Sequence, residues 1–216
     1  MFASIRRYRL RDGSLDVLAR LVDDGFAEVL GAQPGFVSYE FVDCGEGDVL
    51  TISVFHDADG ARRSRDLAHR WTDENLDDFE FTRRDALQGE ILVSRAAGEL
   101  LEPDHAGGAG RYASLRRYEM TGGSVPELMR DVDDMFADEV AALDGFAAYY
   151  VLDCGDGEIL SVTVLRDEAT ARETDEMALR FVTERLSRFR LRRTEAVTGK
   201  VMVSRAKAEL LEPTHA

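Results

Sequence analysis

The sequence repeats itself at a spacing of 110 residues. Residues 1–106 align with residues 111–216 without a gap, and roughly 45 of the 106 aligned positions are identical. The endings show this clearly, because VSRAAGELLEPDHA closes the first copy and VSRAKAELLEPTHA closes the second. Identity that stays in register through every turn indicates a tandem duplication, with repeat 1 at 1–106 and repeat 2 at 111–216. The residues between them, 107–110 (GGAG), predict a flexible linker.

Each repeat has the same order of predicted elements. In repeat 1 a first strand (2–10) leads to a helix that starts after Ser14, and two strands follow as a hairpin (35–55). A second helix starts near Asp57, and a last strand (90–95) closes the unit. The equivalents in repeat 2 are 112–120, Ser124, 145–165, Asp167 and 200–205. The order β-α-β-β-α-β, twice, predicts two ferredoxin-like units of the α+β class. Both helices cover one face of each antiparallel sheet, so the two repeats can cover each other's open face.

Composition narrows the range of partners. The net charge of -15 argues against nucleic acid and anionic membranes as partners. No apolar run approaches the ~20 residues of a membrane helix, and the N-terminus lacks the apolar core of a signal peptide. Two cysteines do not make a disulfide framework. We therefore expect an acidic cytoplasmic protein.

Three features resemble the antibiotic-biosynthesis-monooxygenase family: the run PGFVSYE (34–40), a following strand that ends in SVF (53–55), and a helix led by Asp57. The resemblance spans each repeat nearly end to end. Members of this family are dimeric α+β barrels, so the resemblance implies two ferredoxin-like sheets packed as a barrel around a small ligand cavity. Because both halves are in this chain, it also implies a monomer acting as a pseudo-dimer, or a homodimer of it.

Strand alternation selects candidate ligand-binding residues on the first strand. Ser4, Arg6 and Tyr8 share one side. If that side faces the barrel lumen, they offer a cation and two hydroxyls to a polar aromatic ligand. The alternative is an ordinary strand with ion pairs and a hydrogen-bonded tyrosine. The equivalent residues of repeat 2 are Ser114, Arg116 and Tyr118.

The third strand adds a second set of candidates. The apolar residues at 50, 52 and 54 are expected to face the helices, which leaves Thr51, Ser53 and Phe55 for the cavity. Small, weakly polar groups beside apolar ones are typical of a ligand pocket. They supply no evident acid, base or nucleophile.

The second helix differs most between the repeats, with His69 and Trp71 where repeat 2 has Leu179 and Phe181. Trp71 lies on the apolar stripe, so it either packs in the core or contacts a ligand. His69 lies at the edge of that stripe. An imidazole there could act as a general base, or it could simply be solvated beside Asp73. With Arg6, His69 is our candidate catalytic residue, and repeat 1 is the candidate active half.

Metal and cofactor sites are not expected. The four histidines and two cysteines have no spacing typical of a metal site. Haem-degrading relatives of the family use an Asn on the first strand and a Trp followed by a His on the second helix. Here the first strand has no Asn and His69 precedes Trp71, so those roles are not carried over. No nucleotide or serine-hydrolase motif is present either.

Two functions remain open. The resemblance implies a cofactor-independent monooxygenase that acts on a small aromatic or polyketide-like molecule. The alternative is a non-catalytic protein that binds a small ligand or responds to stress.

The repeated tail is expected to be structural: ELLEP should lay Leu100-Leu101 and Leu210-Leu211 against the neighbouring half, and Pro103 and Pro213 should end it.

Overall fold

The computed structural model describes residues 1–102 and 110–216, so most of the predicted linker (107–110) and Pro103 lie outside the described residues. Each repeat folds into strands, helices and short turns in the predicted order. The elements of repeat 1 are β1 (Phe2–Asp12), α1 (Leu15–Leu21), η1 (Val22–Phe26), α2 (Ala27–Gly31), β2 (Phe36–Asp43), β3 (Asp48–Phe55), α3 (Ala58–Asn75), β4 (Glu80–Ala96) and η2 (Gly98–Leu101). Those of repeat 2 are β5 (Tyr112–Met120), α4 (Val125–Val132), η3 (Asp133–Ala137), α5 (Asp138–Ala141), β6 (Phe146–Asp153), β7 (Glu158–Leu165), α6 (Glu168–Arg185), η4 (Ser187–Phe189), β8 (Leu191–Ala206) and η5 (Ala208–Leu211).

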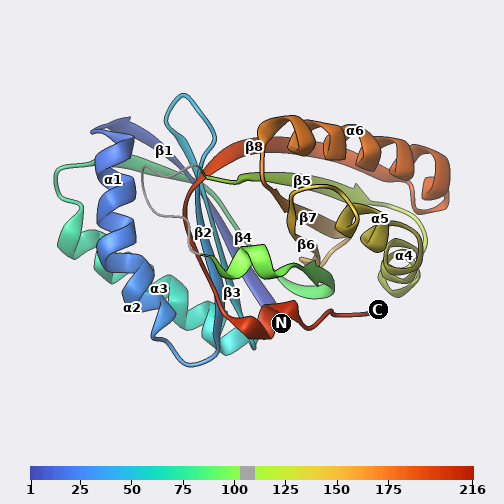
Figure 1. Cartoon of the computed structure of the whole chain (residues 1–216), viewed down its shortest axis with the longest axis horizontal. Coiled ribbons are helices and arrows are strands. Elements are labelled where there is room, and N and C mark those ends of the chain that lie inside the picture. The colour runs from blue at the N-terminus through green and yellow to red at the C-terminus, as the bar shows by residue number, and fades with distance from the viewer. Residues whose placement is uncertain (103–109) are drawn as a thin grey trace.

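The strands form one closed antiparallel barrel in the order β1-β3-β2-β8-β5-β7-β6-β4. The last strand of each repeat pairs on one side with its own repeat and on the other side with the partner repeat. Thus β4 pairs with β1 and β6, while β8 pairs with β5 and β2. The helices of the two repeats cover opposite sides of the barrel (Figure 1). The predicted fold class, a single-chain α+β barrel of two ferredoxin-like units, is confirmed.

The barrel lumen is filled by apolar side chains from both repeats. Ala3 and Ile5 of β1 and Leu50, Ile52 and Val54 of β3 belong to one buried cluster with the equivalent residues of β5 and β7. An eight-stranded barrel is just wide enough for side chains to fill it. The prediction that the residues at 50, 52 and 54 face the helices was therefore wrong. The prediction that a ligand cavity lies in the lumen was also wrong, because apolar side chains fill the lumen.

The outer face of the barrel packs against the helices instead. The cluster between helices and sheet in repeat 1 joins Leu18, Val22 and Phe26 to Tyr39 and Phe41 of β2. Alternation along a strand shows which residues share a face, but it does not show which face is inside. In repeat 1 the residues that point inward are mostly small or branched, and the large aromatic ones point outward.

A carboxyl group interrupts the apolar lumen. Glu40 lies on β2 between Tyr39 and Phe41, which face the helices, so its side chain points inward, and it is fully buried. Ser38 Oγ donates to Glu40 Oε2 at 3.5 Å, and Glu40 Oε1 has no partner within the described residues. Burial raises the pKa of Glu40 to about 8. The equivalent position in repeat 2 is Tyr150, whose pKa is raised by burial and then by the charge of Glu40.

The repeated tails cross to the opposite repeat. Leu100 of η2 and Leu210 of η5 are fully buried in the shared cluster of the lumen. Ala97 N donates to Ala147 O at 2.9 Å, and Lys207 N donates to Val37 O at 2.9 Å. The prediction that ELLEP packs each tail against the neighbouring half is confirmed.

An aspartate side chain caps the second helix of each repeat. Asp57 accepts a hydrogen bond from Gly60 N at 2.6 Å and Asp167 accepts one from Thr170 N at 2.9 Å, as the predicted helix starts require. Ser14 and Ser124 precede their helices, but neither side chain caps the backbone. The hydroxyl of Ser124 donates to the carboxylate of Glu127 instead, at 2.7 Å.

The long last strands exceed their predicted bounds, because β4 already begins at Glu80 and β8 at Leu191. Their first halves are largely exposed and polar, so the sequence lacks the alternation that marks a strand. Pairing with β1 and β5 forms them.

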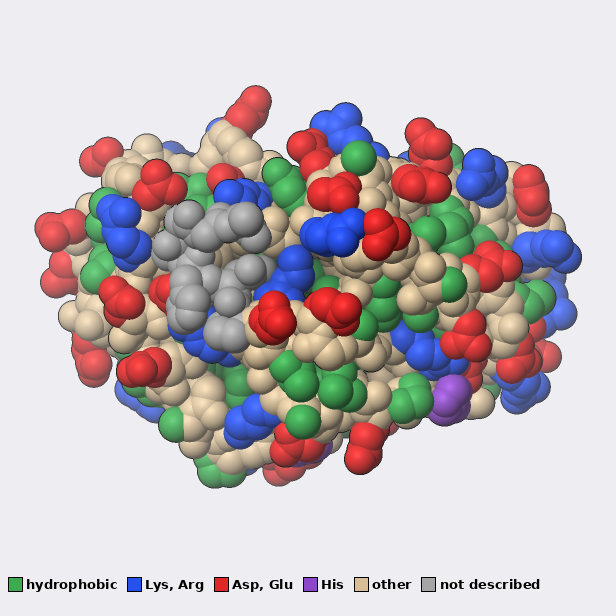
Figure 2. Space-filling view, viewed as in Figure 1, with side chains coloured by type: hydrophobic (Ala, Val, Ile, Leu, Met, Phe, Trp, Pro, Cys, Tyr) green, Lys and Arg blue, Asp and Glu red, His purple; other side chains and the backbone are tan. Residues whose placement is uncertain are grey.

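On the molecular surface, acidic and basic side chains are interspersed across the face seen in Figure 2, so the net charge of -15 is not gathered into one patch there. None of the helices in the described part of the chain is both long and apolar enough to cross a membrane.

Candidate functional site

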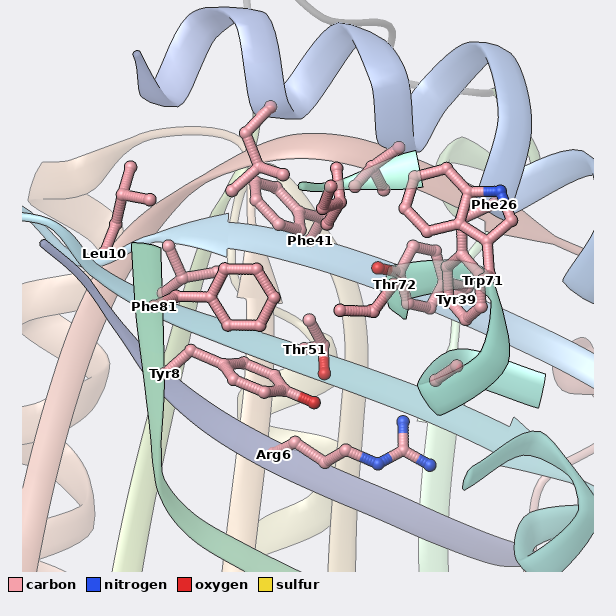
Figure 3. A pocket seen from close by; sticks show the side chains of 15 residues that line it. Arg6, Tyr8, Leu10, Phe26, Tyr39, Phe41, Thr51, Trp71, Thr72 and Phe81 are labelled. Atoms are coloured by element: carbon pink, nitrogen blue, oxygen red, sulfur yellow. The ribbon is translucent and has the colours of Figure 1, made fainter. Parts of the chain in front are cut away.

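A pocket lies between the outer face of the barrel and the helices of repeat 1 (Figure 3). Its volume of about 70 Å³ exceeds the ~10–15 Å³ needed for one water molecule. It is lined by β-strand residues Arg6, Tyr8, Leu10, Tyr39, Phe41, Val49, Thr51 and Phe81, and by helix-side residues Leu18, Val22, Phe26, Ala68, Trp71, Thr72 and Leu76.

Strand register and helix periodicity bring these residues together. Arg6 and Tyr8 alternate on the outer face of β1, and Arg6 pairs with Thr51 of β3. Thr51 in turn pairs with Phe41 of β2. Above the sheet, α3 presents Trp71 one turn from Ala68, along the apolar stripe that the sequence predicted.

Aromatic rings form the walls of the pocket. The rings of Phe26 and Trp71 lie 5.4 Å apart, and Phe26 also meets Tyr39 edge to face at 5.4 Å. Tyr8 meets Phe81 edge to face at 5.8 Å. Aromatic pairs at these distances hold each other in fixed orientations, so the walls of the pocket are mutually supported.

Polar groups converge on one side of the pocket. The hydroxyls of Tyr8 and Thr51 point toward one another beside the guanidinium group of Arg6 (Figure 3). Arg6 is only 3% exposed, and its Nη2 donates to Ser64 Oγ at 3.3 Å. Thr51 Oγ1 is buried and has no hydrogen-bond partner within the described residues. Burial lowers the pKa of Arg6 and raises that of Tyr8. Tyr8 therefore stays protonated at neutral pH and can donate a hydrogen bond.

The structure gathers some of the predicted site residues in this pocket. Arg6, Tyr8, Thr51 and Trp71 all line it, although it lies outside the barrel and not in the lumen. Ser4, Ser53 and Phe55 are buried on the same outer face but do not line the pocket. Phe55 packs on Phe36 at 5.9 Å.

His69 lies away from the pocket. Its side chain is 79% exposed on α3, and its Nε2 is 3.6 Å from Asp73 Oδ2. A general base must come within hydrogen-bond reach of the proton it takes. The predicted role of His69 therefore has no support from its position.

Several lining residues were not among the sequence-based candidates. Phe26, Tyr39, Phe41 and Phe81 form much of the aromatic wall, and Ser64 holds Arg6. Tyr39 and Phe41 alternate on β2 within and just after PGFVSYE, so strand periodicity in that run was an available signal. Phe81 stands in the polar first half of β4, where no such signal exists.

Repeat 2 has a smaller pocket at the equivalent place, of about 40 Å³. Phe181 replaces Trp71 there and stacks on Phe136 at 4.5 Å, closer than the equivalent pair of repeat 1. Of the three predicted residues, Tyr118 lines this pocket, whereas Ser114 and Arg116 do not.

The lining of the repeat-1 pocket contains no Asp, Glu, His or Cys. Among all the residues that the structure describes, no three such side chains gather closely enough to hold a metal ion. The side-chain groups that the lining offers for chemistry are the guanidinium of Arg6 and the hydroxyls of Tyr8, Tyr39, Thr51 and Thr72.

Comparison with known proteins identifies the fold. No protein-family model and no curated protein matches the sequence. A candidate monooxygenase from Fusobacterium nucleatum subsp. nucleatum ATCC 25586 superposes with a TM-score of 0.64 at 8% identity, covering 99% of this chain and 94% of that one. A candidate monooxygenase from Lactobacillus acidophilus NCFM gives 0.62 at 10% identity, with 100% of both chains covered.

A third solved structure, a candidate chlorite dismutase, gives a TM-score of 0.62 at 13% identity, covering 93% of this chain and 94% of that one. All three identities are low, so these likenesses show a shared fold, the dimeric α+β barrel. They do not show a shared activity, because one fold can carry many functions.

Proposed function

We propose that the chain is a cofactor-independent monooxygenase that binds a small aromatic or polyketide-like molecule in the repeat-1 pocket. One observation carries the proposal: an aromatic-walled pocket holds a buried cation and two hydroxyls on one side. Few polar groups in a largely apolar cavity are typical of a site that orients a small molecule. The two structural neighbours described as candidate monooxygenases add support.

The chemistry of the lining suits a substrate that supplies its own electrons. A hydroxylated aromatic ring can lose a proton and react with oxygen as its anion. A ring C–H and the phenolic C–O⁻ would then both become C=O, giving a quinone, and the second atom of O₂ would leave as water. Arg6 would stabilise the negative charge that develops on the ring oxygen, which is strongest in a site that excludes water. Tyr8 and Thr51 would donate to the same oxygen or to its neighbour.

Oxygen uptake with hydroxylated aromatic substrates tests the proposal. We expect wild-type protein to consume oxygen in the absence of added metal or flavin. Tyr8→Phe and Thr51→Val should each lower the rate by about tenfold, the effect of losing one hydrogen bond to a charged oxygen. Tyr118→Phe, the same change in repeat 2, is the matched control. Equal losses in Tyr8→Phe and Tyr118→Phe would overturn the assignment to repeat 1.

The same assay tests His69. Because its side chain is exposed and outside the pocket, His69→Ala should leave the rate unchanged. A large loss would restore the general-base hypothesis and require a rearranged site.

A non-catalytic binding role is the second candidate. It is favoured by one observation, the lack of any carboxylate, imidazole or thiol among the lining residues. Binding of aromatic ligands with no oxygen uptake across a range of hydroxylated substrates would support this role over the enzyme.

A further inference from the structure

We propose that the repeat-1 pocket is selective for an anion carried on a flat ring, and that repeat 2 has no such site because Asp175 already pairs with Arg116, the equivalent of Arg6. The inference rests on the proposed function for the existence of a ligand. Beyond the proposed function, it specifies the charge of the ligand and the number of binding sites per chain.

Arg6 is a buried cation that lacks a counter-charge. It is 3% exposed, its Nη2 donates to the neutral hydroxyl of Ser64, and it makes no ion pair with any residue that the structure describes. Burying a charge is costly unless it is paired. A ligand anion beside Tyr8 and Thr51 would supply the missing partner.

Repeat 2 shows what such a partner looks like. Arg116 is fully buried, and its Nε donates to Asp175 Oδ1 at 2.8 Å while its Nη1 donates to Thr163 Oγ1 at 3.1 Å. Arg193 reaches Asp175 Oδ2 from the other side at 3.1 Å. The carboxylate of Asp175 thus lies between two arginines and neutralises the buried one.

In repeat 1 the same three positions are all cationic. Asp175 corresponds to Arg65, Arg116 corresponds to Arg6, and Arg193 corresponds to Arg83, at the spacing of 110 residues. Arg65 is 56% exposed and lies 3.9 Å from Asp66, while Arg83 is exposed. The charges of Arg65 and Arg83 act on Arg6 in the same direction as its burial, lowering its pKa. One substitution therefore turns an internal ion pair into a site open to an outside anion.

The rest of the pocket decides what carries the anion. Phe26, Phe41, Trp71 and Phe81 surround the polar side, and the volume of about 70 Å³ leaves no room for a large polyanion. An aromatic carboxylate or a phenolate matches the charge and the aromatic character of this lining. The shared feature is one anionic oxygen on a ring.

The ligand charge can be tested with Trp71, the only tryptophan of the chain, as an internal reporter. We expect benzoate to change its fluorescence saturably and to bind at least about tenfold more tightly than the neutral benzamide, because charge-assisted hydrogen bonds are the stronger ones. Acetate, an anion without a ring, should bind more weakly than benzoate. Calorimetry should give one benzoate site per chain.

A matched pair of variants tests the role of position 65. Arg65→Asp recreates the arrangement of Asp175 and should lower benzoate affinity at least about tenfold, because the pocket then supplies its own anion. Arg63→Asp makes the same change of net charge at an exposed position of the same helix and should have less than about a twofold effect. Both positions are exposed, and circular dichroism verifies folding.

The outcomes separate the two proposals. If neither benzoate nor benzamide binds, the pocket takes no aromatic ligand, and both the proposed function and this inference fail. If benzamide binds as tightly as benzoate, or two benzoate sites are found, the proposed function stands and this inference is overturned. Equal losses in Arg65→Asp and Arg63→Asp would also overturn it, since a general charge effect would then explain the binding.

Discussion

Glu40 and Arg6 show how single residues depart from the pattern around them. Both are buried ionisable groups on strands, and both have a different residue or a different environment at the equivalent position of the other repeat. Glu40 lies in the lumen near Tyr150, its equivalent in repeat 2, whereas Arg6 has no carboxylate partner within the described part of the chain and its equivalent Arg116 is paired with Asp175. The two repeats are similar in sequence overall, but they differ in the surroundings of these two buried groups.

Replacing Glu40 with Gln is expected to flatten the pH dependence of stability. Burial raises the pKa of Glu40 from 4.5 to about 8, so the folded chain keeps a proton that the unfolded chain releases. The stability linked to this carboxyl is full below its unfolded pKa and is lost as pH rises toward 8, by up to about 1.4 kcal/mol per pH unit. Urea unfolding across this range measures the slope, with exposed Glu28→Gln as control. Equal slopes in wild type and Glu40→Gln would contradict the prediction.

Asp175→Asn should destabilise the chain by about 1–3 kcal/mol, because Arg116 would stay buried without an ionised partner. The value lies below that of a fully buried pair because the side chain of Asp175 is 30% exposed. Arg65→Gln, at the equivalent position of repeat 1, removes a cation near another cation and should change stability by less than about 0.5 kcal/mol. Thermal unfolding measures the stability of both variants. Equal losses of stability in Asp175→Asn and Arg65→Gln would contradict the prediction.

At the scale of elements, the sequence was sufficient for the order of strands and helices and for the capping aspartates Asp57 and Asp167. It also grouped Arg6, Tyr8 and Thr51 correctly, because strand period fixes which side chains share a face. It could not decide which face is inside, since both faces mix apolar and polar residues. It missed Phe81 because β4 begins among polar residues that become a strand only by pairing with β1.

Loss of a tail should lower the stability of the fold but leave ligand binding intact. Leu210 is fully buried across the seam between repeats, so Leu210→Ala should cost about 2–5 kcal/mol. Deleting 209–216 should destabilise at least as much, because it also removes the hydrogen bond from Thr214 N to Ser94 Oγ. Ligand binding per folded chain should persist in both. Lost binding with unchanged urea unfolding would mean that the tail belongs to the site.

The whole molecule is one barrel that neither repeat can close. In repeat 1, β2 and β4 leave edges that are paired by β8 and β6 of repeat 2, and the lumen cluster is drawn from both. Because this core is shared, the two repeats are expected to unfold together, in a single cooperative transition.

A chain of residues 1–106 is therefore expected to form a homodimer and not a folded monomer. Its exposed edges and lumen face can be satisfied only by a second copy. Light scattering coupled to size-exclusion chromatography measures the mass, and dilution should unfold the dimer. A stable folded monomer would contradict the shared-core description.

That dimer would meet a difficulty which the natural chain avoids. Two-fold symmetry places a residue that lies near the axis opposite its own copy, so Glu40 would face a second Glu40 there. In the natural chain it meets Tyr150 instead. Covalent joining of the halves removes the need for such a residue to pack against its own copy. One half can then bind an outside molecule, while the other, with Asp175 in place, stabilises the fold.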